Sequence, residues 1–242
     1  MDRATVSGTV CRRFNSSRAY HFESRSFYVA LNPLIVRVSG VIKALFNLIF
    51  GIIYKKYYKV LLEKKNSKMK WLKHFNTINN HKYWVMHYCF KAGLYKQGIL
   101  HDLSKYNPAE FLVGAKYFLG NDSPNNAERR DIGYSSSWLH HKGRNKHHWE
   151  YWVDFTRSGL KPAKMPNRYI LEMFCDRVAA SMIYQGKNYH DHHPLEYYNG
   201  GKHSYIMHPH TRSLLEKLLI YLDEHGLDAT IQYIKENIDK NG

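Results

Sequence analysis

Apolar residues recur at helical spacing through most of the chain. Between residues 71 and 97 they include Trp71, Phe75, Ile78 and Val85, which would line one face of a helix. Further helices are predicted from Pro108, from Asn167 to Tyr184, and over residues 209–225 and 227–238, which Gly226 separates. No run stands out in which β-branched and polar residues alternate as in a strand. We therefore expect an all-α fold.

Polar stretches interrupt this pattern. Residues 120–135 are rich in Gly, Asn, Ser and charge, and we expect a loop with a short turn there. Residues 186–203 are also polar, and we expect another loop. Residues 137–155 are rich in histidine and aromatic residues, with Gly143 near the middle. That segment is either one helix or a helix that breaks at Gly143.

The chain before the predicted domain differs from the rest. Residues 1–37 have no clear period, and we expect a disordered leader, although an organelle-targeting peptide has a similar composition. Residues 38–70 predict an apolar and basic extension, with the apolar part at 38–62. One interpretation is a membrane anchor, which either lies at an anionic membrane surface or spans the membrane from near Leu34. The other is a helix that packs on the domain. We expect the domain itself to cover 71–238.

Charge and cysteine content narrow the class of protein. The net charge is +16, but residues 1–70 hold 14 Lys and Arg against 3 acidic residues, while the remainder holds 22 against 17. The basic excess is thus local, and a nucleic-acid partner is not expected from it. The three cysteines form no CxxC motif, which argues against a zinc ribbon or a disulfide scaffold. We expect a cytoplasmic protein, with membrane association left open.

Histidine is abundant, with 16 residues, and one histidine precedes an aspartate at a predicted helix end. His101 and Asp102 close the apolar run Ile99–Leu100, and an imidazole beside a carboxylate suits a divalent metal ion. Lys105 follows one helical turn later and would face the same cleft as a phosphate-binding or proton-transfer group. The alternative for Lys105 is a solvated surface lysine.

The densest histidine cluster is WLHHKGRNKHHWEYW, residues 138–152. Its candidate metal ligands form two adjacent pairs, seven residues apart: His140, His141, His147 and His148. Arg144 and Lys146 lie between the pairs and could bind an anionic substrate near the metal. The alternative is a histidine-rich aromatic surface.

Asp176 is the candidate carboxylate of the helix predicted from Asn167. It lies among residues that would pack inward, and a buried carboxylate is unfavourable unless it is paired. Its partner is either a metal ion or the side chain of Arg177. Glu172, one turn earlier, is a second candidate carboxylate.

The order of these residues resembles the HD superfamily of metal-dependent phosphohydrolases, in which the string His-Asp, apolar, small, Lys is common. Here that string is His101-Asp102-Leu103-Ser104-Lys105. The resemblance implies an HD-domain-like helical bundle, a first metal ligand at His81 and a closing carboxylate at Asp176. It also implies middle ligands from His140 or His141 and from His147 or His148 in members with two metals.

A second resemblance is more specific. Residues 71–238 look like an uncharacterised bacterial family, domain of unknown function 5662, through GILHDLSKYNPAEF, WLHHKGRNKHHWEYW, KMPNRYILEMFCDRVAAS and PLEYY. It implies no substrate.

The leading hypothesis is therefore hydrolysis of a phosphate ester, either a nucleotide or another small phosphorylated metabolite. One or two divalent ions (Mn, Fe, Co, Ni or Zn) would activate a water, and Lys105, Arg144 and Lys146 would neutralise phosphate charge. Two alternatives stay open. The first is a di-iron enzyme acting on oxygen or peroxide, and the second is a non-enzymatic basic module that binds membrane or nucleic acid. The oligomeric state is not predicted.

Overall fold

The computed structural model describes residues 65–120, 122–240 and 242, which belong to one compact unit. The predicted leader at 1–37 and the apolar segment at 38–62 lie outside these residues, so their interpretations are not tested. No helix in the described part of the chain is both long and apolar enough to cross a membrane.

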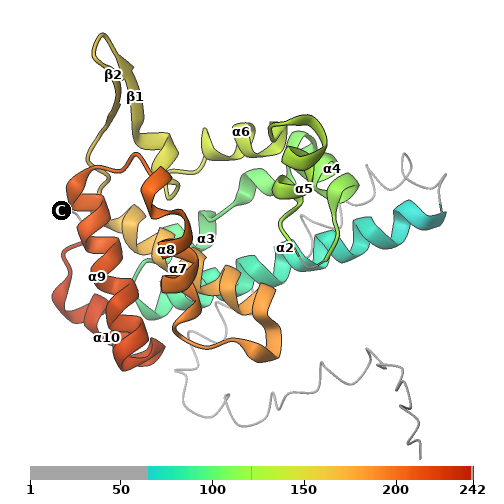
Figure 1. The fold of residues 1–242 in the computed structure, drawn as a ribbon. Helices are drawn as coiled ribbons and strands as arrows, with labels where there is room; N and C mark the ends of the chain where they lie inside the picture. The colour runs from blue at the N-terminus through green and yellow to red at the C-terminus, as the bar shows by residue number, and fades with distance from the viewer. Residues whose placement is uncertain (1–64, 121, 241) are drawn as a thin grey trace, which may run out of the picture. The chain divides into compact units, whose positions relative to one another are not determined.

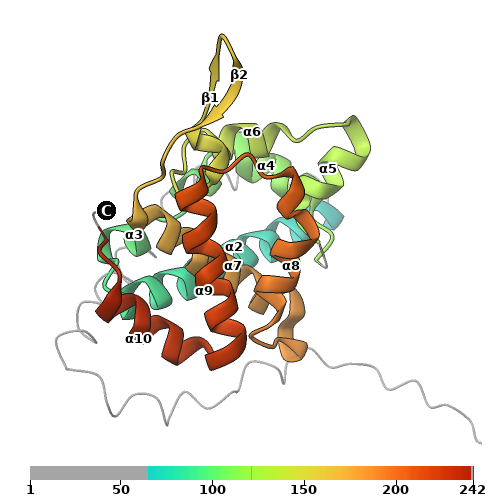
Figure 2. The same cartoon turned by 60° about the vertical axis from the view of Figure 1, so that its left-hand side comes forward.

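The fold is all-α, as predicted, and Figures 1 and 2 show its helices from two sides. The first elements are α2 (Lys65–Lys91), α3 (Tyr95–Leu100), the 3-10 turn η2 (Leu103–Tyr106), α4 (Pro108–Tyr117), α5 (Pro124–Ile132) and α6 (Ser136–Lys142). After them come η3 (Trp149–Trp152), β1 (Val153–Thr156), β2 (Gly159–Pro162), α7 (Asn167–Gln185) and η4 (Gly186–Asn188). The last elements are α8 (His193–Gly201), η5 (Lys202–Ser204), α9 (Pro209–His225) and α10 (Leu227–Asn237).

The hydrophobic core lies where α2, α7, α9 and α10 pack together. Its fully buried side chains include Val85 and Cys89 of α2, Phe174 of α7, Leu218 of α9 and Ile234 of α10. Along each of the four helices the core residues recur at helical spacing, which is why the sequence pattern predicted these helices. The core fixes α2 and α7 against each other, and these two helices carry residues of the site described below.

Two helices replace predicted loops. α5 lies inside the stretch 120–135, and α8 lies inside 186–203, so both loop predictions were wrong. α5 starts with Pro124 in its first turn and ends at Gly133, whose φ is 84°. Its buried residue is Glu128 rather than an apolar side chain, so no hydrophobic period marked it.

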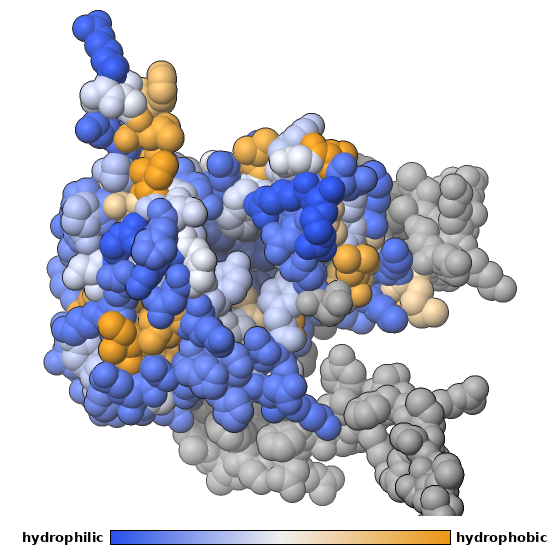
Figure 3. Space-filling view, viewed as in Figure 1, coloured by the Kyte–Doolittle hydropathy of each residue, from blue (hydrophilic) through white to orange (hydrophobic). Residues whose placement is uncertain are grey.

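The sequence also gave no sign of a small β-hairpin, which projects from the helices (Figures 1 and 2). β1 and β2 pair antiparallel, with Val153 opposite Pro162 and Phe155 opposite Leu160. Because opposite residues share a face, one face of the hairpin is wholly apolar. Phe155 is 81% exposed, and Figure 3 shows apolar surface along the projecting hairpin.

Candidate metal centre

The turn between α3 and η2 carries His101 and Asp102. The backbone N–H of His101 donates to Gln97 O at 2.8 Å, which closes α3. Asp102 then takes φ 53° and ψ 26°, and in the described chain no other non-glycine residue has a positive φ. Aspartate tolerates this left-handed region better than most residues do. The reversal buries both residues, each of which is 1% exposed.

A buried lysine ties this turn to α2. Lys82 Nζ donates to the backbone oxygens of Ile99 at 2.9 Å and His101 at 2.5 Å. Burial lowers the pKa of Lys82 to about 8, against the opposing effect of the carboxylates of Asp102 and Glu172. Since His81 immediately precedes Lys82 in α2, the same contact holds the turn beside His81.

The first group of candidate ligands consists of His81, His101, Asp102 and Asp176, whose ligand atoms all lie within 4.8 Å of one another. His81 Nε2 is 2.9 Å from Asp176 Oδ1 and 3.7 Å from Asp102 Oδ2. His101 Nε2 is 3.3 Å from Asp102 Oδ2. Helices α2 and α7 and the turn after α3 thus bring together all four residues that the HD resemblance implied.

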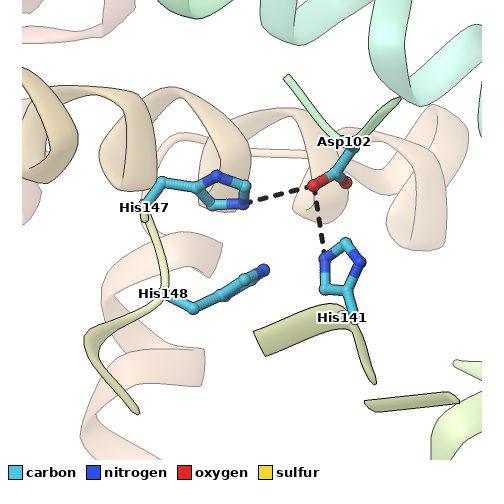
Figure 4. Close-up of side chains that lie close together, drawn as sticks. All are labelled: Asp102, His141, His147 and His148. Carbon is cyan, nitrogen blue, oxygen red and sulfur yellow. Dashed lines mark ion pairs between the residues drawn. The ribbon is translucent and has the colours of Figure 1, made fainter. Parts of the chain in front are cut away.

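The second group consists of Asp102, His141, His147 and His148, drawn in Figure 4. His141 Nε2 is 3.2 Å and His147 Nε2 is 3.3 Å from Asp102 Oδ1. α6 ends at Lys142, so the chain breaks at Gly143 and returns with His147 and His148. Asp102 therefore offers Oδ2 to the first group and Oδ1 to the second.

Glu172 connects the two groups from behind. Its Oε1 atom lies 2.9 Å from His101 Nδ1 and 3.1 Å from His147 Nδ1. A carboxylate that accepts the Nδ1 proton of an imidazole fixes the ring and leaves Nε2 as the metal-binding atom. Glu172 can do this for one histidine of each group. It also lies one helical turn before Asp176 on α7.

Glu110 of α4 is a hydrogen-bond partner of the two histidines of α6, as Glu172 is of His101 and His147. Its Oε2 atom lies 2.7 Å from His141 Nδ1, and its Oε1 atom lies 2.5 Å from His140 Nδ1. The hydrogen bond to Glu110 is thus the role that the structure gives His140, which stands outside both ligand groups among the described residues. Sequence reasoning missed Glu110, although it occurs in the same string, GILHDLSKYNPAEF, as the His-Asp pair.

Protonation differs among the buried histidines. Burial lowers the pKa of His81 and of His148, so both imidazoles are neutral near pH 7. Burial also opposes protonation of His101 and His141, but the carboxylate of Asp102 outweighs it and the pKa of each is raised. The pKa of Asp102 and of Asp176 is lowered despite burial because histidines surround them. The carboxylates are therefore ionised and ready to bind a cation.

The donor set fits divalent transition-metal ions. Imidazole nitrogens and carboxylate oxygens suit Mn, Fe, Co, Ni and Zn. His147 Nε2 and His148 Nε2 are buried and make no hydrogen bond with any described residue, although His147 Nε2 lies 3.3 Å from the carboxylate of Asp102. Unpaired buried polar atoms destabilise a fold by about 1–3 kcal/mol each. A bound ion would satisfy both nitrogens.

Of the three predicted cationic groups, Lys105 alone contacts the ligands. Its Nζ atom lies 2.6 Å from Asp102 Oδ2. Burial acts to lower the pKa of Lys105, but the carboxylates of Asp102 and Asp176 raise it overall, so the lysine stays charged. Arg144 and Lys146 are exposed: Arg144 donates to His140 O at 3.2 Å, and Lys146 Nζ lies 5.8 Å from the centre of the Tyr151 ring.

The alternative partner of Asp176 proves to be engaged elsewhere. The guanidinium of Arg177 lies over the rings of Tyr198 and Tyr205, 5.7 and 5.6 Å from their centres. Asp176 instead contacts His81. The carboxylate of Asp176 therefore belongs to the histidine cluster.

A family model described as "Family of unknown function (DUF5662)" matches residues 70–220. No curated protein and no solved structure matches the chain. Every residue of the two ligand groups, together with Glu110 and Glu172, lies within the matched range.

Proposed function

The chain belongs to DUF5662, a family of unknown function, and we propose that it hydrolyses phosphate esters with two divalent metal ions. The observation that carries the proposal is the position of Asp102, whose two carboxylate oxygens face different ligand groups. A carboxylate so placed can hold two ions side by side. The order of His81, His101-Asp102 and Asp176 resembles that of HD-superfamily phosphohydrolases, which supports the same class of reaction.

Seven side chains would hold the ions: His81, His101, Asp102, His141, His147, His148 and Asp176. Ions bound there would lower the pKa of a coordinated water toward neutrality and polarise the phosphoryl oxygens. Glu172 and Glu110 orient the imidazoles behind them. Five of the seven side chains are buried and His148 and Asp176 are half-buried, so the site has limited contact with bulk water, which strengthens the electrostatic interactions at the reacting phosphate.

Lys105 would bind the substrate phosphate. Its ammonium pairs with Asp102 and stays protonated because the carboxylates of Asp102 and Asp176 outweigh its burial, so it serves as a fixed positive charge rather than as a base. A group of this kind neutralises negative charge that develops on the phosphoryl oxygens in the transition state. The proposed substrate is accordingly a small phosphate ester, such as a nucleotide or a phosphorylated metabolite.

The test uses the full chain without a His tag, loaded separately with Mn²⁺, Fe²⁺, Co²⁺, Ni²⁺ or Zn²⁺. For each sample we measure the amount of bound metal and the rate of hydrolysis of p-nitrophenyl phosphate, of its bis ester and of a set of nucleotides. Asp102→Asn keeps a residue that tolerates the left-handed backbone but removes the charge, and it should lose both ions and all activity. Lys105→Gln should keep the ions and lower kcat/KM by about 100-fold. The matched control is Lys161→Gln, on the exposed hairpin.

Other outcomes point to the alternatives. If the protein binds two equivalents of iron, consumes oxygen or peroxide and releases no phosphate, di-iron redox chemistry replaces the proposal. A chain that takes up no metal under any of these conditions would remove the proposal and favour a binding module. Equal activity of Lys105→Gln and wild type would remove Lys105 from the site but leave the metal centre in place.

A further inference from the structure

We propose that the start of α8 forms a separate, exposed metal site for a cation of the Zn²⁺ class, held by His192, His193 and Glu196. The three side chains each offer a ligand atom, and these atoms lie within 4.8 Å of one another. They share no residue with the buried centre. The inference therefore stands independently of the proposed hydrolase activity.

Helical spacing accounts for the cluster. His192 immediately precedes α8, His193 is its first residue, and Glu196 follows one turn later. Residues three and four apart on a helix are neighbours on its surface, so the carboxylate returns to the side of both imidazoles. The rings of His192 and His193 stack with their centres 4.2 Å apart.

Both hydrogen-bond contacts of His193 involve Nδ1, so the tautomer decides whether Nε2 can bind a metal ion. In one tautomer Nδ1 accepts the backbone N–H of His190 at 2.9 Å, and in the other it donates to the backbone oxygen of His190 at 3.0 Å. In the second tautomer Nε2 presents a bare lone pair, and an ion bound at Nε2 selects that tautomer. This is the arrangement of a metal-binding histidine, whose other ring nitrogen donates to a carbonyl or carboxylate.

The segment that carries the cluster is anchored at a neighbouring residue. Asp191 Oδ2 accepts the backbone N–H of Leu227, at the start of α10, at 3.0 Å. Asp191 Oδ1 accepts the hydroxyl of Tyr189 at 2.9 Å. Asp191 is thus occupied by structural contacts, and it holds the adjacent histidines in place. A site held in this way loses less conformational entropy when it binds an ion.

The chemistry of the ligands selects the cation. Two imidazoles and one carboxylate suit Zn²⁺, Co²⁺, Ni²⁺ or Cu²⁺, whereas Ca²⁺ and Mg²⁺ prefer oxygen ligands. His192 and Glu196 are exposed and His193 is half-buried, so further coordination positions face solvent. An ion there should exchange with chelators faster than an ion in the buried centre.

The experiment compares the untagged full chain with His192→Asn/His193→Asn by equilibrium dialysis against Zn²⁺ and by Co²⁺ absorption. The double variant should bind one equivalent fewer, and the readily chelated fraction of Co²⁺ absorbance should disappear. Glu196→Gln should weaken that same equivalent. The control is His203→Asn, an exposed histidine outside every ligand group found in the described chain, which should bind as wild type does.

Two results would overturn the inference. One is equal stoichiometry in wild type and the double variant. The other is an equal loss in His203→Asn, which would mean that exposed imidazoles bind Zn²⁺ without a defined site. Because His192 and Glu196 are exposed and His193 is only half-buried, circular dichroism without metal should be the same for all variants. Failure of the hydrolase proposal would leave this equivalent unchanged.

Discussion

Glu172 makes the two ligand groups depend on one another. The same carboxylate oxygen accepts from His101, a member of the first group, and from His147, a member of the second. Fixing one imidazole therefore positions the hydrogen-bond acceptor of the other. Glu110 contrasts with it, because its ligand contact is with His141 of the second group.

Glu172→Gln should therefore weaken both metal equivalents together. Loss of a carboxylate behind a ligand histidine lowers metal affinity by about 10–100-fold, and here it reaches a ligand of each group. The matched variant Glu110→Gln should weaken one equivalent and spare the other. Calorimetric titration of each metal-free variant with Mn²⁺ distinguishes the two patterns. Weakening of a single equivalent in Glu172→Gln would show that Glu172 does not couple the groups.

At the residue scale, the sequence indicated the candidate ligands better than the carboxylates that hydrogen-bond to them. The adjacent pair His101-Asp102 and the two histidine pairs of 140–148 are visible as letters, and Asp176 stands out as an acid in an apolar helix. The choice of His141 over His140 depends on which ring reaches Asp102, and that follows from the end of α6 at Lys142. The role of Glu110 could not be predicted from the sequence, because its hydrogen-bond partners lie about 30 residues further along the chain.

At the scale of elements, α2 and α4 meet at a histidine that takes no part in the site. His74 of α2 lies between Phe111 and Phe118, with ring centres 5.4 and 5.5 Å away. A β-carbon at Gly114 of α4 would overlap the His74 ring, so glycine permits this approach. Burial, and then the charge of Lys105, lower the pKa of His74 to about 4.

This contact should make the fold sensitive to acid. The pKa is near 6.5 in the unfolded chain and about 4 in the folded chain, so the unfolded state binds more protons between these values. Stability is therefore lost as pH falls from about 6.5 toward 4, by about 2 kcal/mol between pH 7 and pH 5. His74→Leu should remove that part of the loss, as measured by urea unfolding of metal-free protein at both pH values. Phe118→Leu, at the same interface, should destabilise equally at both; an unchanged pH dependence in His74→Leu would contradict the assignment.

The elements that the sequence predicted are those with an apolar face. α7, α9 and α10 bury Leu, Ile and Val at helical spacing. α5 and α8 escaped prediction for a physical reason: α5 buries Glu128, which accepts hydrogen bonds from Ser135, Ser136 and Ser137, and α8 contains two adjacent glycines. The hairpin escaped because each strand has four residues, too few to show a period.

On the scale of the whole described molecule, the candidate metal centre joins segments that are far apart in the chain. Its candidate ligands come from α2, the turn after α3, the segment 141–148 and α7. An ion that binds these residues when they are folded, and binds the unfolded chain poorly, stabilises the complete unit through mass action.

Removal of metal should therefore lower the melting temperature of the whole unit. At a free metal concentration about 100 times Kd, the linkage contributes about 2.7 kcal/mol. For a unit of this size that corresponds to about 5–10 °C. Thermal scans with Mn²⁺ and with EDTA should show the difference, and Asp102→Asn should show none. An identical melting temperature with and without metal in wild type would separate the cluster from folding stability.

The backbone of Asp102 sets a limit on how this centre can vary. Position 102 must adopt a left-handed conformation and must also present an anionic oxygen to each of two ligand groups. Asparagine and glycine meet the first demand without the charge, and glutamate keeps the charge on a longer side chain with a poorer fit to that backbone. Among the 20 amino acids, no substitute satisfies both demands. A saturation library at position 102 that is selected for metal binding should retain aspartate alone. A library at His140, which lies outside the ligand groups, should accept other residues.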